Sequence, residues 1–257
     1  MLRSLRAELQ KAKRRHDLLA CLLIPMATLV WAGYAAPDSA ENLDDAFHAL
    51  FYALPMMNTV LMPVGMAMLA SRLWDVEIKG NFPKLLYTLQ SRRSLFTAKA
   101  LLGIGEVILI TTLELAGALG LGSWYGYQDF PPAEQILYYF LCTCTVNLML
   151  FFSEMLLTIL LANPLPALCV GITGALVGLF SGFMPPIVGY FVPWGYYIPL
   201  NSYILASWDP DTRIVVYGIR SFNYPLLIWC AALAIFFFSF TWRAIRQKSA
   251  NKKSIGK

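Results

Sequence analysis

Long apolar stretches alternate with short polar stretches along the 257-residue chain. Each apolar stretch carries few or no charges and has about the 20 residues that a helix needs to cross a bilayer. Six such stretches occur, at about 18–36, 48–71, 98–122, 135–162, 165–185 and 224–242. The pattern therefore predicts an all-α membrane protein with six transmembrane helices.

The first 16 residues carry a different pattern. Leu2, Leu5 and Leu9 recur at helical spacing, while the basic residues fall mostly elsewhere on the helical wheel. A basic amphipathic helix of this kind lies in the interface of a membrane. Residues 1–16 are therefore expected to form a cytoplasmic interfacial helix before the first span. A signal peptide with residues 18–33 as its apolar core is the alternative interpretation.

The composition agrees with a membrane location. Hydrophobic residues make up 58% of the chain and charged residues only 14%, against about a quarter charged in soluble proteins. The mean hydropathy is +0.58. So few charges exclude a soluble fold, and no segment is long and polar enough for a separate enzyme domain. A six-span domain is expected at 17–246, followed by a basic cytoplasmic tail at 247–257.

The positive charges gather on one side of the predicted arrangement. Of the 20 Lys and Arg residues, 18 precede the first span, lie between Arg72 and Lys99, or follow the sixth span. The positive-inside rule therefore predicts a multi-pass protein of the cell membrane with both termini in the cytoplasm. The external loops would be 37–47, 123–134 and 186–223, of which the first two contain acids but no Lys or Arg.

Side chains typical of catalysis or metal binding are sparse. The five cysteines lie in apolar stretches without C-x-x-C spacing, and His16 and His48 fall at the ends of spans. Neither a metal site nor a catalytic residue is therefore expected. A G-x-x-x-x-G-K-[ST] phosphate loop is absent, because the only Gly-Lys pair is residues 256–257. The chain is expected not to be an enzyme and to hold no cofactor, and no nucleic-acid partner is expected.

The segment 72–99, between the second and third spans, is amphipathic. Acids stand near its start, basic residues stand near its end, and Leu85, Leu86 and Leu89 share one face. This order complements the dipole of a short helix. A helix of this kind, lying parallel to the membrane, suits the docking of a soluble partner.

The same segment resembles the permeases of ABC-2 type exporters. In that family a Glu followed by Gly, a Leu-Leu pair, a Pro-Ser-Arg-like turn and an Ala-Lys lie between spans two and three. The residues that match here are Glu77, Gly80, Leu85-Leu86, Ser91-Arg92 and Ala98-Lys99, with Gln90 in place of the turn proline. The resemblance covers the whole layout, including the long aromatic loop before the sixth span.

The resemblance implies that Glu77, Gly80, Leu85, Leu86 and Arg92 belong to a coupling helix that seats in a separate ATPase. Two permease subunits, identical or homologous, would pair in the lipid membrane with a cytoplasmic ABC ATPase dimer that binds ATP and Mg. The chain is also similar to the permeases of lantibiotic (bacteriocin) immunity exporters, which expel cationic antimicrobial peptides from the membrane. An ABC-2 permease for another lipid or drug is the alternative, followed by a secondary transporter, although no clear repeat of two halves is visible.

Three acids lie inside the predicted spans: Glu106 and Glu114 in the third and Glu154 in the fourth. A carboxylate at membrane depth normally faces the bundle interior or a wet cavity. Counting about 1.5 Å per residue places Glu106 and Glu154 at similar depth. With Asn147 they form either a substrate pathway that attracts cations or a set of structural hydrogen bonds. For Glu114 the structural role is favoured.

The fifth span carries a glycine face. Gly171, Gly174, Gly178 and Gly182 recur at steps of three, four and four residues. Small residues allow helix backbones to approach closely in lipid, so a packing seam, within the subunit or across a dimer, is favoured over a flexible gate. In the loop 186–223, dense Trp and Tyr residues indicate either short re-entrant helices, as the resemblance implies, or an interfacial aromatic belt.

Overall fold

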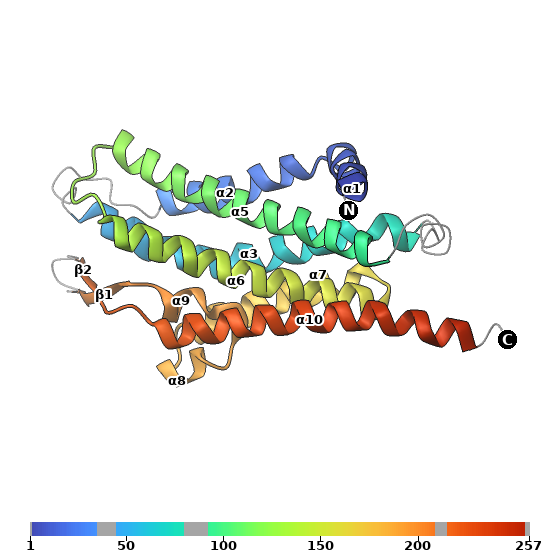
Figure 1. Cartoon of the computed structure of the whole chain (residues 1–257). Helices are drawn as coiled ribbons and strands as arrows, with labels where there is room; N and C mark the ends of the chain where they lie inside the picture. The colour runs from blue at the N-terminus through green and yellow to red at the C-terminus, as the bar shows by residue number, and fades with distance from the viewer. Residues whose placement is uncertain (1, 35–44, 80–91, 209–214, 255–257) are drawn as a thin grey trace.

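The computed structural model describes residues 2–34, 45–79, 92–208 and 215–254. Over these ranges the chain forms a bundle of long helices that run side by side (Figure 1). The elements in chain order are α1 (Leu2–Arg15), α2 (Asp17–Tyr34), α3 (Ala46–Lys79), α5 (Arg92–Trp124), α6 (Ala133–Leu161), α7 (Pro164–Ser181), α8 (Pro186–Gly189), η2 (Pro193–Gly195), α9 (Tyr197–Leu200), β1 (Tyr203–Trp208), β2 (Val215–Ile219) and α10 (Tyr224–Ser254).

Six helices, α2, α3, α5, α6, α7 and α10, are long and apolar enough to cross a membrane. The prediction of six transmembrane helices after an N-terminal amphipathic helix is thus confirmed. Figure 1 shows α1 nearly end-on, so it crosses the bundle axis. The end of the bundle that carries α1 and the last turns of α10 is called the α1 end, and the opposite end, with β1 and β2, is called the hairpin end.

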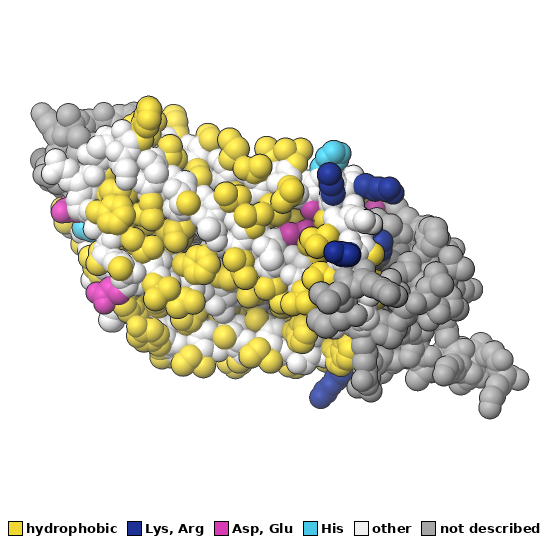
Figure 2. All heavy atoms as spheres, turned by 45° about the horizontal axis from the view of Figure 1, so that its top comes forward, with side chains coloured by type: hydrophobic (Ala, Val, Ile, Leu, Met, Phe, Trp, Pro, Cys, Tyr) yellow, Lys and Arg dark blue, Asp and Glu magenta, His cyan; other side chains and the backbone are white. Residues whose placement is uncertain are grey.

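The side chains on the surface differ between the middle of the bundle and its ends. Hydrophobic side chains cover the middle of the bundle, while Lys and Arg side chains gather at the α1 end (Figure 2). An apolar band between polar ends is the surface that a bilayer requires. Apart from Arg220, next to β2, the positive charges of the described residues therefore lie at one end of the spans, in agreement with the charge pattern of the sequence.

Three helices, α3, α5 and α10, run beyond the boundaries that hydropathy predicts. α3 continues to Lys79 and α5 begins at Arg92, so both ends of the segment 72–99 are helical. α10 continues to Ser254, into the segment expected to be a tail. Hydropathy marks where a helix leaves the lipid, whereas backbone hydrogen bonding continues past that point.

The segment between α7 and α10 folds back against the bundle. α8, η2 and α9 are short helical turns, and η2 and α9 pack against α3 and α6, with η2 also against α7. β1 and β2 form an antiparallel hairpin in which Tyr203 is opposite Ile219 and Trp208 is opposite Val215. The sequence pattern does not predict this hairpin, because neither strand alternates strictly between apolar and polar residues.

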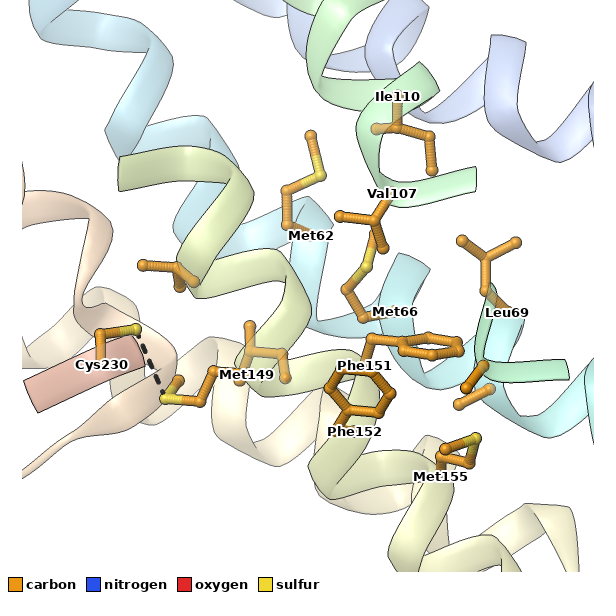
Figure 3. Close-up of a cluster of buried hydrophobic side chains, with 14 of the residues drawn as sticks. Met62, Met66, Leu69, Val107, Ile110, Met149, Phe151, Phe152, Met155 and Cys230 are labelled. Carbon is orange, nitrogen blue, oxygen red and sulfur yellow. Dashed lines mark hydrogen bonds between the residues drawn. The ribbon is translucent and has the colours of Figure 1, made fainter. Parts of the chain in front are cut away.

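The main core lies where α3, α5 and α6 meet, and it is rich in Met and Phe (Figure 3). Gly103 of α5 permits the tightest approach, because a Cβ there would lie 2.1 Å from Cζ of Phe151. On the other side of α6, the Sγ of Cys230 lies 3.7 Å from the Sδ of Met149 (Figure 3). The five cysteines are free thiols.

Candidate functional site

Glu114 is fully buried and joins three spans. Asn58 of α3 donates through Nδ2 to its Oε1 at 2.7 Å, and the Tyr139 hydroxyl of α6 donates to the same oxygen at 2.6 Å. Asn58 Nδ2 also lies 3.1 Å from the Tyr139 hydroxyl. These contacts agree with the structural role favoured for Glu114. The sequence does not identify either partner of Glu114. Asn58, a lone amide in the apolar second span, is the signal that could have pointed to one of them.

Asn147 links α5, α6 and α9. Its Oδ1 accepts a hydrogen bond of 2.6 Å from the Tyr197 hydroxyl, and its Nδ2 donates to Thr111 Oγ1 at 3.3 Å. The side chain is fully buried. Asn147 therefore anchors the segment that folds back between α7 and α10, and a role in a substrate pathway stays a prediction.

Glu106 and Glu154 lie on neighbouring antiparallel helices, and no hydrogen bond joins them in the described part of the chain. Gly103 packs on Phe151, and Thr111 bonds to Asn147. This register places Glu106 level with residues near 150. Glu154 is therefore about one helical turn, roughly 6 Å, nearer to the α1 end, so the expected similarity in depth holds only to within a turn.

Glu106 faces charged groups of the α1 end. The side chain is 7% exposed, and neither carboxylate oxygen has a hydrogen-bond partner. The charges that act on it belong to Asp17, Arg15, Arg72 and Lys99. Glu106 is thus a buried acid inside the bundle, which repulsion from Asp17 and attraction to the three basic groups reach without a direct contact.

Arg15 and Arg72 converge on Asp17, where α1, α2 and α3 meet. Nη2 of Arg15 lies 2.7 Å from Oδ2 of Asp17, and Nε of Arg72 lies 3.5 Å from Oδ1. Each arginine also donates to the backbone carbonyl of the other. The chain turns between α1 and α2 at His16, which has a left-handed φ of 56°. Asp17 is 3% exposed, so the two guanidinium groups surround a buried carboxylate.

A second buried ion pair binds α1 to α5. Nζ of Lys99 lies 2.9 Å from Oε2 of Glu8, and the two side chains are 0% and 1% exposed. Lys99 also donates to the Leu73 carbonyl and lies 5.3 Å from the centroid of the Trp74 ring. Burial raises the pKa of Glu8, but attraction to Lys99 and Lys11 outweighs it, so the pKa lies below its ordinary value.

Glu154 lies next to the segment that folds back from the hairpin end. Its side chain is 1% exposed and approaches the indole of Trp194. Neither Nε1 of Trp194 nor Oε2 of Glu154 has a hydrogen-bond partner in the described structure. The third and fourth spans therefore present their acids to different surroundings, Glu106 to cations at the α1 end and Glu154 to an aromatic ring.

The glycine face of α7 meets other parts of the same chain. Gly171 faces Pro63 and Ala67 of α3, Gly174 and Gly178 face Trp194, and Gly182 faces Ile198. The approach is closest at Gly174, where a Cβ would lie 2.4 Å from the Trp194 ring. The absence of side chains on this face thus lets the indole lie between α7 and the interior of the bundle.

The side chains that the family resemblance assigns to ATPase coupling lie outside the described part of the structure. Gly80, Leu85 and Leu86 belong to residues 80–91. Glu77 lies in the last turn of α3, which ends at Lys79, and Arg92 begins α5, but only their backbones are described. Their coupling role stays a prediction.

Six apolar helices that enclose buried polar groups define a polytopic membrane protein with a polar interior. The family model described as "ABC-2 family transporter protein" matches residues 4–188, from α1 to α8. The chain belongs to this family. Its permeases are membrane transport components that normally work with an ATPase partner. Neither a curated protein nor a solved structure matched the chain.

Proposed function

We propose that the chain is the permease subunit of an ATP-driven exporter. A separate cytoplasmic ABC ATPase dimer would hydrolyse ATP with Mg, and a second permease subunit, identical or homologous, would complete the pathway. The observation that carries the proposal is the family match over most of the spans. Both termini would be cytoplasmic, since the basic α1 end would face the ATPase.

Coupling to the ATPase would occur through residues 77–92. α3 and α5 flank this segment and are packed directly against the bundle, so force applied between them reaches two spans at once. The full chain should co-purify with an ABC ATPase, and Glu77→Ala and Gly80→Asp should weaken transport without unfolding the spans. Glu134→Ala, an exposed acid at the hairpin end, is the matched control. Undiminished ATP-dependent transport in both coupling variants would contradict this assignment.

The substrate that we propose is a cationic amphipathic peptide, such as a lantibiotic, expelled from the membrane. The hairpin end, which would be external, carries the exposed acids Asp129 and Glu134 and the partly exposed Asp45. Arg220 is the single Lys or Arg among the described residues of that end, and its guanidinium donates to the carbonyls of Asn201 and Ile198. An acidic surface of this kind raises the local concentration of cations.

Buried acids support the same substrate class. Glu106 has two carboxylate oxygens without a hydrogen-bond partner and Glu154 has one. Unpaired carboxylate oxygens are available to the ammonium or guanidinium groups of a peptide. The Met- and Phe-rich interior supplies an adaptable apolar surface for the rest of such a substrate.

Peptide tolerance tests the proposal. Cells that express the chain with its ATPase should tolerate a cationic membrane-active peptide better than cells without it. Glu106→Gln with Glu154→Gln should erode this tolerance, whereas Glu114→Gln, made at equal expression level, should preserve it because its hydrogen bonds are structural. Intact protection in the double variant would remove the two acids as substrate determinants. If no cationic peptide is resisted, an ABC-2 exporter of another lipid or drug becomes the better assignment.

A further inference from the structure

A groove runs along the outside of the bundle between α2 and α3. Its volume is about 730 Å³, within the roughly 300–1,000 Å³ typical of ligand sites. Apolar side chains form its walls, from residues 19–27 of α2 and 60–68 of α3. Its lining includes the small residues Ala20, Ala27 and Gly65, and a Cβ at Gly65 would lie 3.0 Å from Cδ1 of Ile24 across the groove. Arg15, His16 and Arg72 line its end at the α1 end of the bundle.

The length of the groove matches one leaflet of a bilayer. Along α3 the groove runs from Val60 to Arg72, 12 residues or about 18 Å of helix at 1.5 Å per residue. Along α2 it runs from Leu19 to Ala27, about 12 Å, and it continues past the turn at His16 to Arg15 at the end of α1. Half of a bilayer core is about 15 Å thick. The groove thus begins at the level of α1, where headgroups lie, and ends near the middle of the membrane.

The charges at the mouth of the groove favour an anionic group. Arg15 and Arg72 both contact Asp17, which leaves one net positive charge. His16 is exposed beside them, and the neighbouring α1 adds basic side chains on the same end of the surface (Figure 2). The charge of Glu106 also acts on Arg15 and Arg72, but Glu106 faces the bundle interior and does not line the groove. Guanidinium groups bind phosphate through two parallel hydrogen bonds.

We propose that the groove between α2 and α3 binds an anionic glycerophospholipid of the leaflet in which α1 lies. One acyl chain lies between the two helices, and the phosphate lies at Arg15 and Arg72. The lipid fills the apolar surface that α2 leaves uncovered and strengthens the contact of α1 with the first two spans. The site is independent of the exported substrate, so its test is lipid binding and not transport.

The experiment is native mass spectrometry of the full chain after extraction from vesicles that contain equal amounts of dioleoyl-phosphatidylglycerol and dioleoyl-phosphatidylcholine. The anionic lipid should be retained about fivefold over the zwitterionic one, the ratio expected for one uncompensated basic charge near the membrane surface. Arg15→Gln with Arg72→Gln should abolish this preference. Asp17→Asn, which removes the counter-charge and keeps the size of the side chain, should increase it.

A second pair of variants tests the apolar part of the site without touching the ion pairs. Ala27→Phe places a ring in the groove, at an exposed position where folding is preserved, and should reduce retention of both lipids. Ala232→Phe, at an exposed position of α10, is the matched control and should leave retention unchanged. Equal retention of the two lipids by the unmodified chain would overturn the proposal. So would an equal loss in both Phe variants, or the finding that Ala27→Phe breaks a dimer while lipid retention stays constant.

Discussion

The ion pair between Glu8 and Lys99 gives the most quantitative prediction. Both side chains are buried, at 1% and 0% exposure, and their charged atoms lie 2.9 Å apart. Removing one partner of a buried pair costs about 3–5 kcal/mol, because the other charge stays buried without compensation. Glu8→Gln should therefore lower the free energy of unfolding by about 3 kcal/mol.

Further variants separate the contributions of Lys99 and Lys11 to the stabilisation by Glu8. In Lys99→Met, Glu8 keeps its contact with Lys11 at 2.7 Å, so the loss should be smaller, about 2 kcal/mol. The double variant, Glu8→Gln with Lys99→Met, should lose only slightly more free energy of unfolding than Lys99→Met alone, because neither charge of the pair stays buried without the other. Lys11→Met is the matched control: Lys11 is 30% exposed, and solvent screening limits its effect to about 1 kcal/mol or less.

Unfolding by sodium dodecyl sulfate in mixed micelles, followed by circular dichroism, measures these free energies. A protease that cuts after basic residues adds a local measurement, since α1 carries five arginine and lysine residues besides its Lys11. α1 should be cut faster in Glu8→Gln than in Lys11→Met. The reasoning is refuted if Lys11→Met costs as much as Glu8→Gln, or if the effects of Glu8→Gln and Lys99→Met simply add in the double variant.

Two other predictions follow from the same structure. The pKa of Glu8 is below its ordinary value of 4.5. The ionised carboxylate therefore stabilises the fold fully above about pH 4.5, and this stabilisation is lost as the pH falls through the lower pKa of the folded state. The midpoint of unfolding should fall on acidification below about pH 4.5, and it should fall less in Glu8→Gln. Gly174→Leu should cost about 1–3 kcal/mol in the same assay because its Cβ would lie 2.4 Å from the Trp194 ring. Gly120→Leu should not destabilise, since a Cβ there meets nothing within 4 Å, and an equal loss in both would contradict the packing argument.

The transmembrane part of the fold could be predicted because the bilayer leaves few options. Backbone groups in lipid must be bonded within the segment, so an apolar stretch of sufficient length becomes a helix. All six spans follow from this rule. Outside the lipid the rule no longer applies, which is why the extension of α3 to Lys79 and the hairpin of β1 and β2 have no counterpart in the sequence analysis.

The polar interior was only partly predictable. Acids in apolar stretches are conspicuous, so Glu106, Glu114 and Glu154 could be selected from the sequence alone. Their partners depend on which faces of the helices meet, and this information is tertiary. Asn58, 56 residues from Glu114, and Trp194, beyond the fifth span, are therefore found only in the structure.

Two polar contacts that join parts of the bundle differ in strength. At the α1 end, Glu8 and Lys99 join α1 to α5 through a buried ion pair, and removing one partner of such a pair costs about 3–5 kcal/mol. Tyr197 of α9 is tied to Asn147, in the middle of α6, by a neutral hydrogen bond, which contributes about 1 kcal/mol. The polar contact that ties the segment between α7 and α10 to α6 is therefore the weaker of the two.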